Sequence, residues 1–376
     1  MEATAATRSL ATIAPRLDRL VAGIRDRGCD AALLIGPTHA AHILAYQRVW
    51  SGPIAVIVAA DGEITMLAPV YEVEAARGQC PTATVIGYGE PGFGLDLSSV
   101  QKMIPVAASK LGRGRLATAS DLPGLAEAVA AEARVEQVPI DDLIHDVRLI
   151  KDLDELHRIG RSFELSLVAQ SAVEAGARPG AAEIELYSAA QAAAQVEAGE
   201  AVDFGSDMLV GARTAEVCGP VAVPGRQRAE QGDVIVADIA LRYQGYWGDT
   251  ARTFIVGDND EAAEVRASIS EVLDDAAEHL RPGVRGCDVF ARIASEIARR
   301  HPGSTFPHHG GHGLGVTGFE DPHLIPADTT VLEEGMVVAV EPGAYFAGRF
   351  GVREENNYVV TADGGLDLRT ILASER

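Results

Sequence analysis

The sequence predicts two domains, the first of which is a layered α/β domain that ends near residue 150. The length of 376 residues exceeds the roughly 100–200 residues of a typical single domain. Helix and strand patterns alternate along residues 1–150, as is typical of layered α/β structure. The pattern changes after the segment RLIKDLDELHRIG, so the second domain is expected to cover residues 151–376.

Local patterns in the first domain indicate helices alternating with short strands. Between Pro15 and Gly28 apolar residues recur at helical spacing, and AALLIG then has the character of a buried strand. Asp61-Gly62 separates two apolar runs and is a two-residue hairpin signal. The other predicted elements are strands at 54–60, 64–69, 82–88, 116–120 and 135–139, and helices near 98–112 and 122–134.

The second domain combines long helices with strand-rich segments. Two Ala-rich helical runs are separated by Arg178-Pro179-Gly180, and a later helix is stopped by Pro282-Gly283. The predicted helices lie at about 152–176, 182–198, 260–280 and 287–300, and the predicted strands at 207–211, 234–242 and 251–256, with further strands in MVVAVEPGAYF and GVREENNYVVT.

Composition and charge argue against several classes of function. The net charge of −22 disfavours nucleic-acid binding, which relies on clustered Lys and Arg. The longest apolar stretch, Ile54 to Ala60, is far short of the ~20 residues of a membrane span, and no apolar signal-peptide core is evident. The cysteines are scattered, which fits reduced thiols in the cytoplasm; they are Cys29, Cys80, Cys218 and Cys287. We therefore expect a cytoplasmic protein with neither a nucleic-acid nor a membrane partner.

Acidic residues and one histidine stand where strand patterns make polar side chains unexpected. Asp238 closes the apolar run VIVA, and Glu341 closes VVAV. A carboxylate in a buried strand is costly unless it is paired or bound to metal. Asp249 follows Asp238 beyond the turn-like YQG, so a hairpin could bring the two acids side by side. Glu355, beside a strand, and His312, in HHGGHGLG, complete the set.

Four carboxylates and one imidazole could share a buried pocket only with compensating positive charge. Two divalent cations would supply that charge, and oxygen ligands with one nitrogen suit Mn²⁺, Co²⁺, Fe²⁺ or Zn²⁺. In two-metal hydrolases the ions lie ~3.5–4 Å apart and share a bridging water or hydroxide. Any one of these residues alone could be an ordinary hairpin or surface residue, so the prediction rests on the whole set.

Four segments resemble, in order, the metal-site motifs of the "pita-bread" family, which includes prolidase, aminopeptidase P, methionine aminopeptidase and creatinase. They are VIVADIALRYQGYWGDTARTF, HHGGHGLG, EEGMVVAVEPGAYF and GVREENNYVV. RLIKDLDE resembles the linker that enters the catalytic domain of two-domain members, and the N-terminal half is similar to their N-terminal domain by pattern. The resemblance implies an α/β creatinase-type N-terminal domain and an α+β pita-bread catalytic domain.

The resemblance also implies the role of each metal-site residue. Asp238 is expected to chelate one metal ion, and Asp249 and Glu355 to bridge both ions. His312 and Glu341 are expected to hold the second ion. Glu341 is also the candidate for carrying a proton between the bridging water and the leaving group.

Two histidines that contact substrate in peptidases of the family are absent from this sequence. Cys218 stands at one of these positions and Phe319, within FEDP, at the other. Losing such a donor typically costs ~10²–10³ in rate. His309 or His323 could replace a lost donor, or each could be a solvated loop residue.

The remaining residues near the motifs have alternative roles. Cys218 is either an acid/base thiol or ligand, or a small buried residue that fills space. Phe319 would make the pocket more apolar, and His308 is the outer-shell catalytic histidine that is retained. Arg353 is expected to orient Glu355 or an acidic group of the substrate, unless it forms a purely structural ion pair.

Three hypotheses about function follow. The favoured one is an Xaa-Pro dipeptidase or aminopeptidase that uses a metal-bridging hydroxide. The second is a metal-dependent hydrolase or lyase of a small non-peptide compound, as in creatinase, ectoine hydrolase and dimethylsulfoniopropionate lyase. The third is a non-catalytic binding protein on a peptidase scaffold. Two-domain members are commonly homodimers, and HILAYQRVW (42–50) is a candidate to reach the partner's pocket.

Overall fold

The computed structural model describes residues 10–47, 52–90, 97–216 and 223–373. Contacts divide these residues into two compact units. One unit is Ala14–Arg148. The other, called below the unit that starts at Leu149, consists mainly of the chain from Leu149 onward and also includes the described residues before Ala14. The domain limits 1–150 and 151–376 stay predictions, because compactness alone does not define a domain.

The unit Ala14–Arg148 is built on a six-stranded mixed sheet with the order β4-β3-β2-β1-β5-β6. β2 and β3 form the antiparallel hairpin that Asp61-Gly62 predicted, and Gly62 has a φ of 96°. The strands are β1 (Ala31–Ile35), β2 (Ala55–Ala59), β3 (Ile64–Pro69), β4 (Thr84–Tyr88), β5 (Arg115–Ser120) and β6 (Glu136–Pro139).

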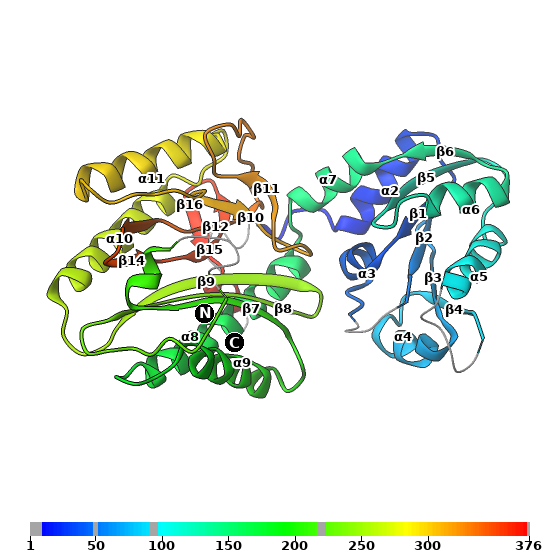
Figure 1. Cartoon of the computed structure of the whole chain (residues 1–376). Helices are drawn as coiled ribbons and strands as arrows, with labels where there is room; N and C mark the ends of the chain where they lie inside the picture. Colours follow the sequence, from blue (N-terminus) through cyan, green and yellow to red (C-terminus); the bar gives the residue numbers. More distant parts are fainter. Residues whose placement is uncertain (1–9, 48–51, 91–96, 217–222, 374–376) are drawn as a thin grey trace. The chain divides into compact units, whose positions relative to one another are not determined.

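Helices cover both faces of this sheet (Figure 1). Leu34 packs in one apolar cluster with residues of α2, α3, α4 and α7, whereas its neighbour Leu33 packs with residues of α5 and α6. This alternation follows from strand geometry, in which successive side chains point to opposite faces. The helices are α2 (Arg16–Asp26), α3 (Pro37–Leu44), α4 (Val73–Gln79), α5 (Leu97–Ala108), α6 (Leu125–Ala133) and α7 (Asp141–Leu149), with the short 3₁₀ helix η1 (Val70–Glu72) before α4.

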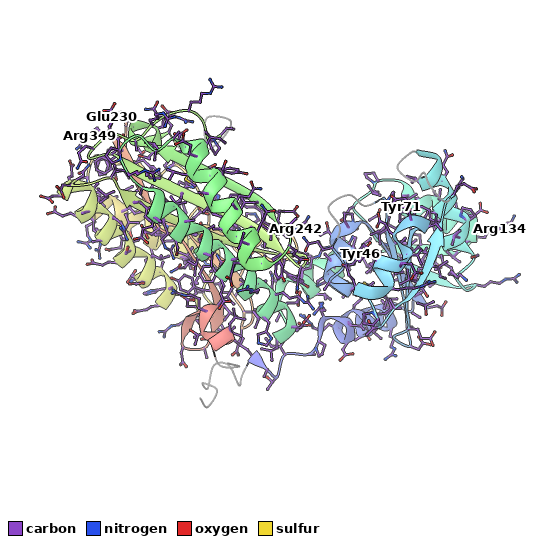
Figure 2. All side chains as sticks on the ribbon, turned by 90° about the horizontal axis from the view of Figure 1, so that it is seen from below. Tyr46, Tyr71, Arg134, Glu230, Arg242 and Arg349 are labelled. Carbon is purple, nitrogen blue, oxygen red and sulfur yellow. The ribbon has the colours of Figure 1, made fainter. Side chains whose placement is uncertain are left out.

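The helix α3 was not predicted, because His39–Leu44 are all buried and the segment lacks an amphipathic period. It contains the start of the segment proposed to reach a partner. Tyr46, labelled in Figure 2, is buried and donates a hydrogen bond from its hydroxyl to Glu72, at 2.8 Å. Tyr46 therefore belongs to the core of its own unit, and residues 48–50 of the proposed segment lie outside the described residues.

The unit that starts at Leu149 contains a three-stranded sheet, a five-stranded sheet and a two-stranded hairpin. The first sheet is β7 (Asp203–Val210), β8 (Val234–Tyr243) and β9 (Tyr246–Ile255). The second has the order β11-β10-β12-β15-β16. Its strands are β10 (Gly311–Gly313), β11 (Glu320–His323), β12 (Val337–Val340), β15 (Asn356–Thr361) and β16 (Gly364–Asp367), and the hairpin is β13 (Gly343–Phe346) with β14 (Phe350–Arg353).

Two helix pairs enclose these strands from opposite sides, as Figure 1 shows. α8 (Leu153–Gly176) and α9 (Glu183–Ala198) share an apolar core with β7 and β8. α10 (Asp260–Glu278) and α11 (Gly286–Arg300) share another with β12, β14 and β15. All four helices were predicted to within a few residues, because their periodic patterns are long. The short helices η2 (Gly211–Ala215) and α12 (Arg369–Ala373) were not predicted.

The hairpin between β8 and β9 positions the first two predicted ligands. Its turn is Gln244-Gly245, with φ values of 48° and 86°, and Tyr243 pairs directly with Tyr246. Positive φ at both central residues is the type I′ geometry, whose twist suits a tight hairpin. Pairing therefore starts at Tyr246 rather than at residue 251, where the sequence pattern predicted the strand to begin.

Candidate metal centre

The five predicted metal ligands come from five separate segments and line one cavity of about 560 Å³. The cavity lies entirely within the unit that starts at Leu149. Asp238 is on β8, Asp249 on β9, His312 on β10, Glu341 directly after β12, and Glu355 between β14 and β15. The structure therefore brings together all five residues that the sequence patterns singled out.

Strand pairing fixes how these side chains meet. Asp249 pairs with Ala240, two residues beyond Asp238, so both carboxylates point to the same face of the hairpin. The Glu341 amide donates a hydrogen bond to the carbonyl of Gly310, at 3.0 Å, next to the strand of His312. The Glu355 amide donates to the carbonyl of Ala251, at 2.9 Å. Each ligand is thus held by backbone pairing.

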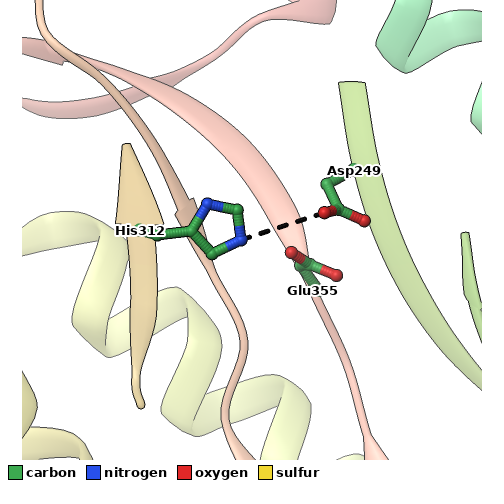
Figure 3. Close-up of side chains that lie close together, drawn as sticks. All are labelled: Asp249, His312 and Glu355. Carbon is green, nitrogen blue, oxygen red and sulfur yellow. Dashed lines mark ion pairs between the residues drawn. The ribbon is translucent and has the colours of Figure 1, made fainter. Parts of the chain in front are cut away.

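The tightest group is Asp249, His312 and Glu355, whose potential ligand atoms lie within 4.8 Å of one another (Figure 3). The His312 Nε2 atom is 3.8 Å from Asp249 Oδ2 and 3.8 Å from Glu341 Oε1. These separations are too long for hydrogen bonds. They leave room between the donor atoms for an ion that contacts several of them.

Buried carboxylate oxygens without a hydrogen-bond partner show that this group fits a divalent cation. Asp249 Oδ1 and Glu355 Oε2 are buried and have no hydrogen-bond partner among the described residues. His312 Nδ1 lies 2.9 Å from the carbonyl of Gly313, so it carries the proton and leaves the Nε2 lone pair facing the acids. A histidine that binds metal is usually oriented by such a bond.

The electrostatics of the cavity also call for positive charge. Burial, followed by repulsion from the neighbouring acids, raises the pKa of Asp249 and of Glu355 well above the ordinary range. Burial likewise raises the pKa of Asp238, to about 6, against the attraction of Arg353. Glu341 differs, because His309 and its other cationic neighbours outweigh burial and lower its pKa. A bound cation would remove the repulsion and keep all four carboxylates ionised.

Arg353 is buried beside the cavity and does not pair with Glu355. Its Nη1 donates to Asp238 in a short bond and lies 4.0 Å from Asp207, and its Nε donates to the hydroxyl of Tyr345, at 2.8 Å. Of the roles expected for Arg353, this contact fits the structural ion pair, and the partner is Asp238 rather than Glu355.

His308 and His309 lie differently with respect to the cavity. The His308 Nε2 atom is 2.7 Å from the Tyr345 hydroxyl, and Nδ1 is 2.7 Å from the His309 carbonyl and 3.7 Å from Glu341 Oε2. His309 instead lines the cavity, with Nδ1 3.0 Å from Glu341 Oε1. This geometry fits the outer-shell position expected for His308, beside Glu341 and outside the cavity lining, and its catalytic role stays a prediction.

Of the other residues predicted to contact substrate, one lines the cavity, one does not, and one lies outside the described residues. Phe319 lines the cavity with 64% of its surface exposed, and its ring centroid is 4.2 Å from that of His312. His323 pairs with His312 in the strand register, but its ring contacts Asp321 at 2.9 Å and it is not among the cavity-lining residues. Cys218 lies outside the described residues.

Sequence reasoning missed three residues that shape the cavity. Asp207 on β7 is directly opposite Asp238 in the register and lines the cavity. Tyr345 links Arg353 to His308, and Lys151 holds Glu320, the residue after Phe319, at 2.9 Å. An acid directly before the apolar run MLV was a usable signal for Asp207. Nothing local marked the partners of Tyr345 or Lys151.

Comparisons with known proteins agree with this geometry. Residues 158–362 match Metallopeptidase family M24, and residues 16–150 match the Creatinase/Prolidase N-terminal domain. The chain is 31% identical to an Xaa-Pro dipeptidase of Pyrococcus horikoshii over 252 residues, which cover 66% of this chain and 71% of that protein. It is 26% identical to an uncharacterized peptidase of Staphylococcus aureus over 367 residues, 93% and 97% of the two chains.

Solved structures show the same architecture. The prolidase of Pyrococcus horikoshii superimposes with a TM-score of 0.78 at 26% identity, covering 94% of this chain and 97% of that one. An X-Pro aminopeptidase from Thermotoga maritima gives a TM-score of 0.79 at 22% identity, with coverage of 94% and 96%, which supports the fold alone. The predicted fold class, a creatinase-type domain followed by a pita-bread domain, is confirmed.

A search of the described residues finds no helix with the length and apolar character of a membrane span.

The family match covers more than half of the chain. It includes every residue that lines the acidic cavity. The chain therefore belongs to metallopeptidase family M24 and is a hydrolase of that family.

Proposed function

We propose that this chain cleaves the Xaa-Pro bond of small peptides as a dipeptidase or aminopeptidase. In this proposal two divalent ions, from among Mn²⁺, Co²⁺, Fe²⁺ and Zn²⁺, are held by Asp238, Asp249, His312, Glu341 and Glu355. The observation that carries the proposal is the pair of buried oxygens, Asp249 Oδ1 and Glu355 Oε2, that have no partner among the described residues in a cavity of peptide size.

When bound, divalent ions would neutralise these carboxylates, polarise the scissile carbonyl and lower the pKa of a water molecule. The chain's own residues do the rest. Glu341 Oε1 faces His309 Nδ1 at 3.0 Å, which holds the carboxylate in place so that its other oxygen can take a proton from the attacking water and pass it to the leaving nitrogen. Arg353 fixes Asp238, and Tyr345 fixes Arg353.

The apolar side of the cavity suits a small substrate. Phe319, Ile184 and Val223 line it and are among the exposed large hydrophobic residues of the described chain. They would pack on apolar parts of the substrate and limit access of water to the acids. The printed names of the relatives, Xaa-Pro dipeptidase and prolidase, support a small peptide as the substrate.

One observation favours a second candidate, a metal-dependent hydrolase or lyase of a small non-peptide compound. Phe319 stands where the family resemblance expects a histidine, and its ring packs against His312 rather than offering a hydrogen bond. His309 is the nearest polar replacement, since it lines the same cavity and its ring centroid is 6.0 Å from that of Phe319. A catalytic or substrate-binding role for Cys218 or His323 stays a prediction.

Metal stoichiometry and a substrate panel test the proposal together. The purified protein would be analysed for bound metal, reconstituted with Mn²⁺ or Co²⁺, and assayed on Xaa-Pro dipeptides and tripeptides. We expect two ions per chain and turnover that a chelator abolishes. Two bound ions without turnover of any peptide would reject the peptidase and favour the non-peptide enzyme, whereas a chain that binds no metal would reject both.

We further propose a homodimer, as the family resemblance implies, and a cytoplasmic location, as the scattered cysteines suggest. Sedimentation equilibrium of the full chain would show twice the 39.5 kDa mass of one chain if the dimer forms. A single species at the mass of one chain would contradict it.

A further inference from the structure

We propose that Asp207 is a specificity-determining residue, which binds a positively charged amino group of the substrate next to an apolar group. This inference rests on the proposed function and names the chemistry that the cavity selects. Asp207 was not among the predicted ligands, and it is the one carboxylate lining the described part of the cavity that belongs to no ligand set.

Asp207 is held in place by its strand and is open to the cavity. It lies on β7 directly opposite Asp238 on β8, and 34% of its side chain is exposed. No hydrogen bond to its carboxylate oxygens exists within residues 10–47, 52–90, 97–216 and 223–373. An ionised carboxylate that is partly buried and lacks donors gains most from a ligand that brings a cationic donor.

Arg353 cannot fully compensate Asp207. Its guanidinium already donates to Asp238 through Nη1 and to Tyr345 through Nε, and Nη1 is 4.0 Å from Asp207. A separation of 4.0 Å lies beyond hydrogen-bond range. If Asp238 also binds a metal ion, Arg353 still has that carboxylate as its nearest partner. Asp207 therefore has no cationic partner within hydrogen-bond range among the described residues, which leaves its carboxylate open to a second cation.

The surroundings of Asp207 specify more than charge. Ile184 and Val223 line the same cavity with 43% and 65% of their surface exposed, and Tyr187 lies one helical turn from Ile184 on α9. Phe319 adds an aromatic ring that is 64% exposed. An ammonium group carried by an apolar side chain satisfies both features, as at the free amino end of a peptide with an apolar first residue.

A matched pair of uncleavable ligands tests this inference by binding rather than by activity. L-Leucinol carries an ammonium group on an apolar chain, and 4-methylpentane-1,2-diol has a hydroxyl in its place. Titration calorimetry on the metal-loaded protein should give leucinol an affinity about 10- to 100-fold above that of the diol, as expected for a hydrogen bond to a charged group. Asp207→Asn should remove this preference.

Asp203→Asn is the matched control. Asp203 lies on the same strand with 31% of its side chain exposed, but it pairs with Arg242 at 2.5 Å and does not line the cavity. Arg242 is labelled in Figure 2. This variant should keep the wild-type preference for leucinol. Asp207→Asn should bind the same number of metal ions as the wild type, which shows that its fold and metal site are intact.

Each outcome decides the inference separately from the proposed function. If Asp207→Asn binds metal and still prefers leucinol, Asp207 is only a counter-ion of Arg353 and the inference is wrong. If Asp207→Asn loses metal, the residue is part of the metal site and the inference is also wrong. If the preference depends on Asp207 but no Xaa-Pro peptide is cleaved, the inference holds for a non-peptide amine while the peptidase proposal fails.

Discussion

Two groups of buried charge in the unit that starts at Leu149 differ in how completely the protein satisfies them. Lys151 is 1% exposed and its ammonium lies 2.9 Å from Glu320, which also accepts a hydrogen bond from the Thr317 amide. Glu355 is 1% exposed and the Asp249 side chain 13%, yet each keeps one buried oxygen without a partner among the described residues. In the first group, folding supplies every charged side chain with a partner from the chain. In the second group, oxygen atoms stay available to coordinate a ligand.

The cost of burying charge makes this contrast informative. An ionised side chain loses several kcal/mol of hydration in the interior unless an opposite charge and hydrogen bonds replace the water. Lys151 and Glu320 meet that requirement within the chain and hold the loop that carries Phe319. Asp249 and Glu355 do not meet this requirement within the chain. Their carboxylates can therefore stay ionised only if a cation binds to them.

Adjacent glutamates provide the sharpest test of this contrast and the largest expected effect. Glu355→Gln should lower activity by more than about 10⁴-fold and reduce the bound metal, because it removes a proposed bridging ligand. Its metal-free form should be at least as stable as metal-free wild type, since the substitution removes a repulsive buried charge. Metal analysis and urea unfolding in chelator would measure both effects.

Glu354→Gln is the control for that experiment. Glu354 is also buried, but it accepts a hydrogen bond from the Thr253 amide and pairs with Arg266 at 3.4 Å, away from the cavity lining. It should keep its metal and lose stability instead. If Glu355→Gln retained two ions and full rate, the assignment of the metal site would be wrong.

Breaking the satisfied pair should destabilise the protein without removing metal ligands. Lys151→Met leaves Glu320 buried without its cation and should cost about 3–5 kcal/mol of unfolding free energy. The double variant Lys151→Met/Glu320→Gln should recover part of this loss, because the unpaired charge is gone. Urea unfolding of the three variants measures the coupling. A loss of unfolding free energy below about 1 kcal/mol for Lys151→Met would show that water reaches the pair and solvates Glu320.

A third way to bury an ionisable group, keeping it neutral, predicts a smaller and pH-dependent effect. His39 lies in the unit Ala14–Arg148, with Nδ1 3.3 Å from Arg148 and Nε2 3.5 Å from Asp121. Burial, and then the charge of Arg148 with a smaller contribution from His42, lowers the pKa of His39 to about 4, against the attraction of Asp121. The unfolded chain therefore takes up this proton at higher pH than the folded chain does.

The sign of the pH effect follows from that order. The contribution of His39 to stability should be constant above about pH 7 and fall as pH drops from about 6.5 to 4, by on the order of 3 kcal/mol. The rate of amide hydrogen exchange in β1, which lies in the core of that unit, would measure this change in stability. His39→Gln should flatten the slope, whereas His145→Gln, at an exposed position on α7, should leave it unchanged. An unchanged slope in His39→Gln would contradict the assignment.

Long, regular patterns were predicted well from the sequence. The four long helices of the second unit and the hairpin strands β2 and β3 follow from periodicity and turn residues that need no tertiary information. The short helix α3 was missed because it is buried on all sides. The start of β9 was placed five residues late, because only the pairing of Tyr243 with Tyr246 shows how tight the turn is.

The residues that gather in the candidate site were predicted from the sequence, but their supporting contacts were not. Carboxylates at the ends of apolar strands and one histidine between glycines are chemically unusual, so each stands out in the sequence. The partners of Arg353 could not be read in the same way, since Asp238 is 115 residues away along the chain. His309 was weighed only as a replacement donor, and the structure places it against Glu341.

By itself, the sequence determined the family and the two-part architecture and singled out the five candidate donor residues, because residue type and local periodicity carry that information. Only the tertiary structure decided that His309 rather than His308 lines the cavity and that Arg353 pairs with Asp238. The physical reason is strand register. Neighbouring residues in extended chain point in opposite directions, so their facing depends on pairing with distant segments.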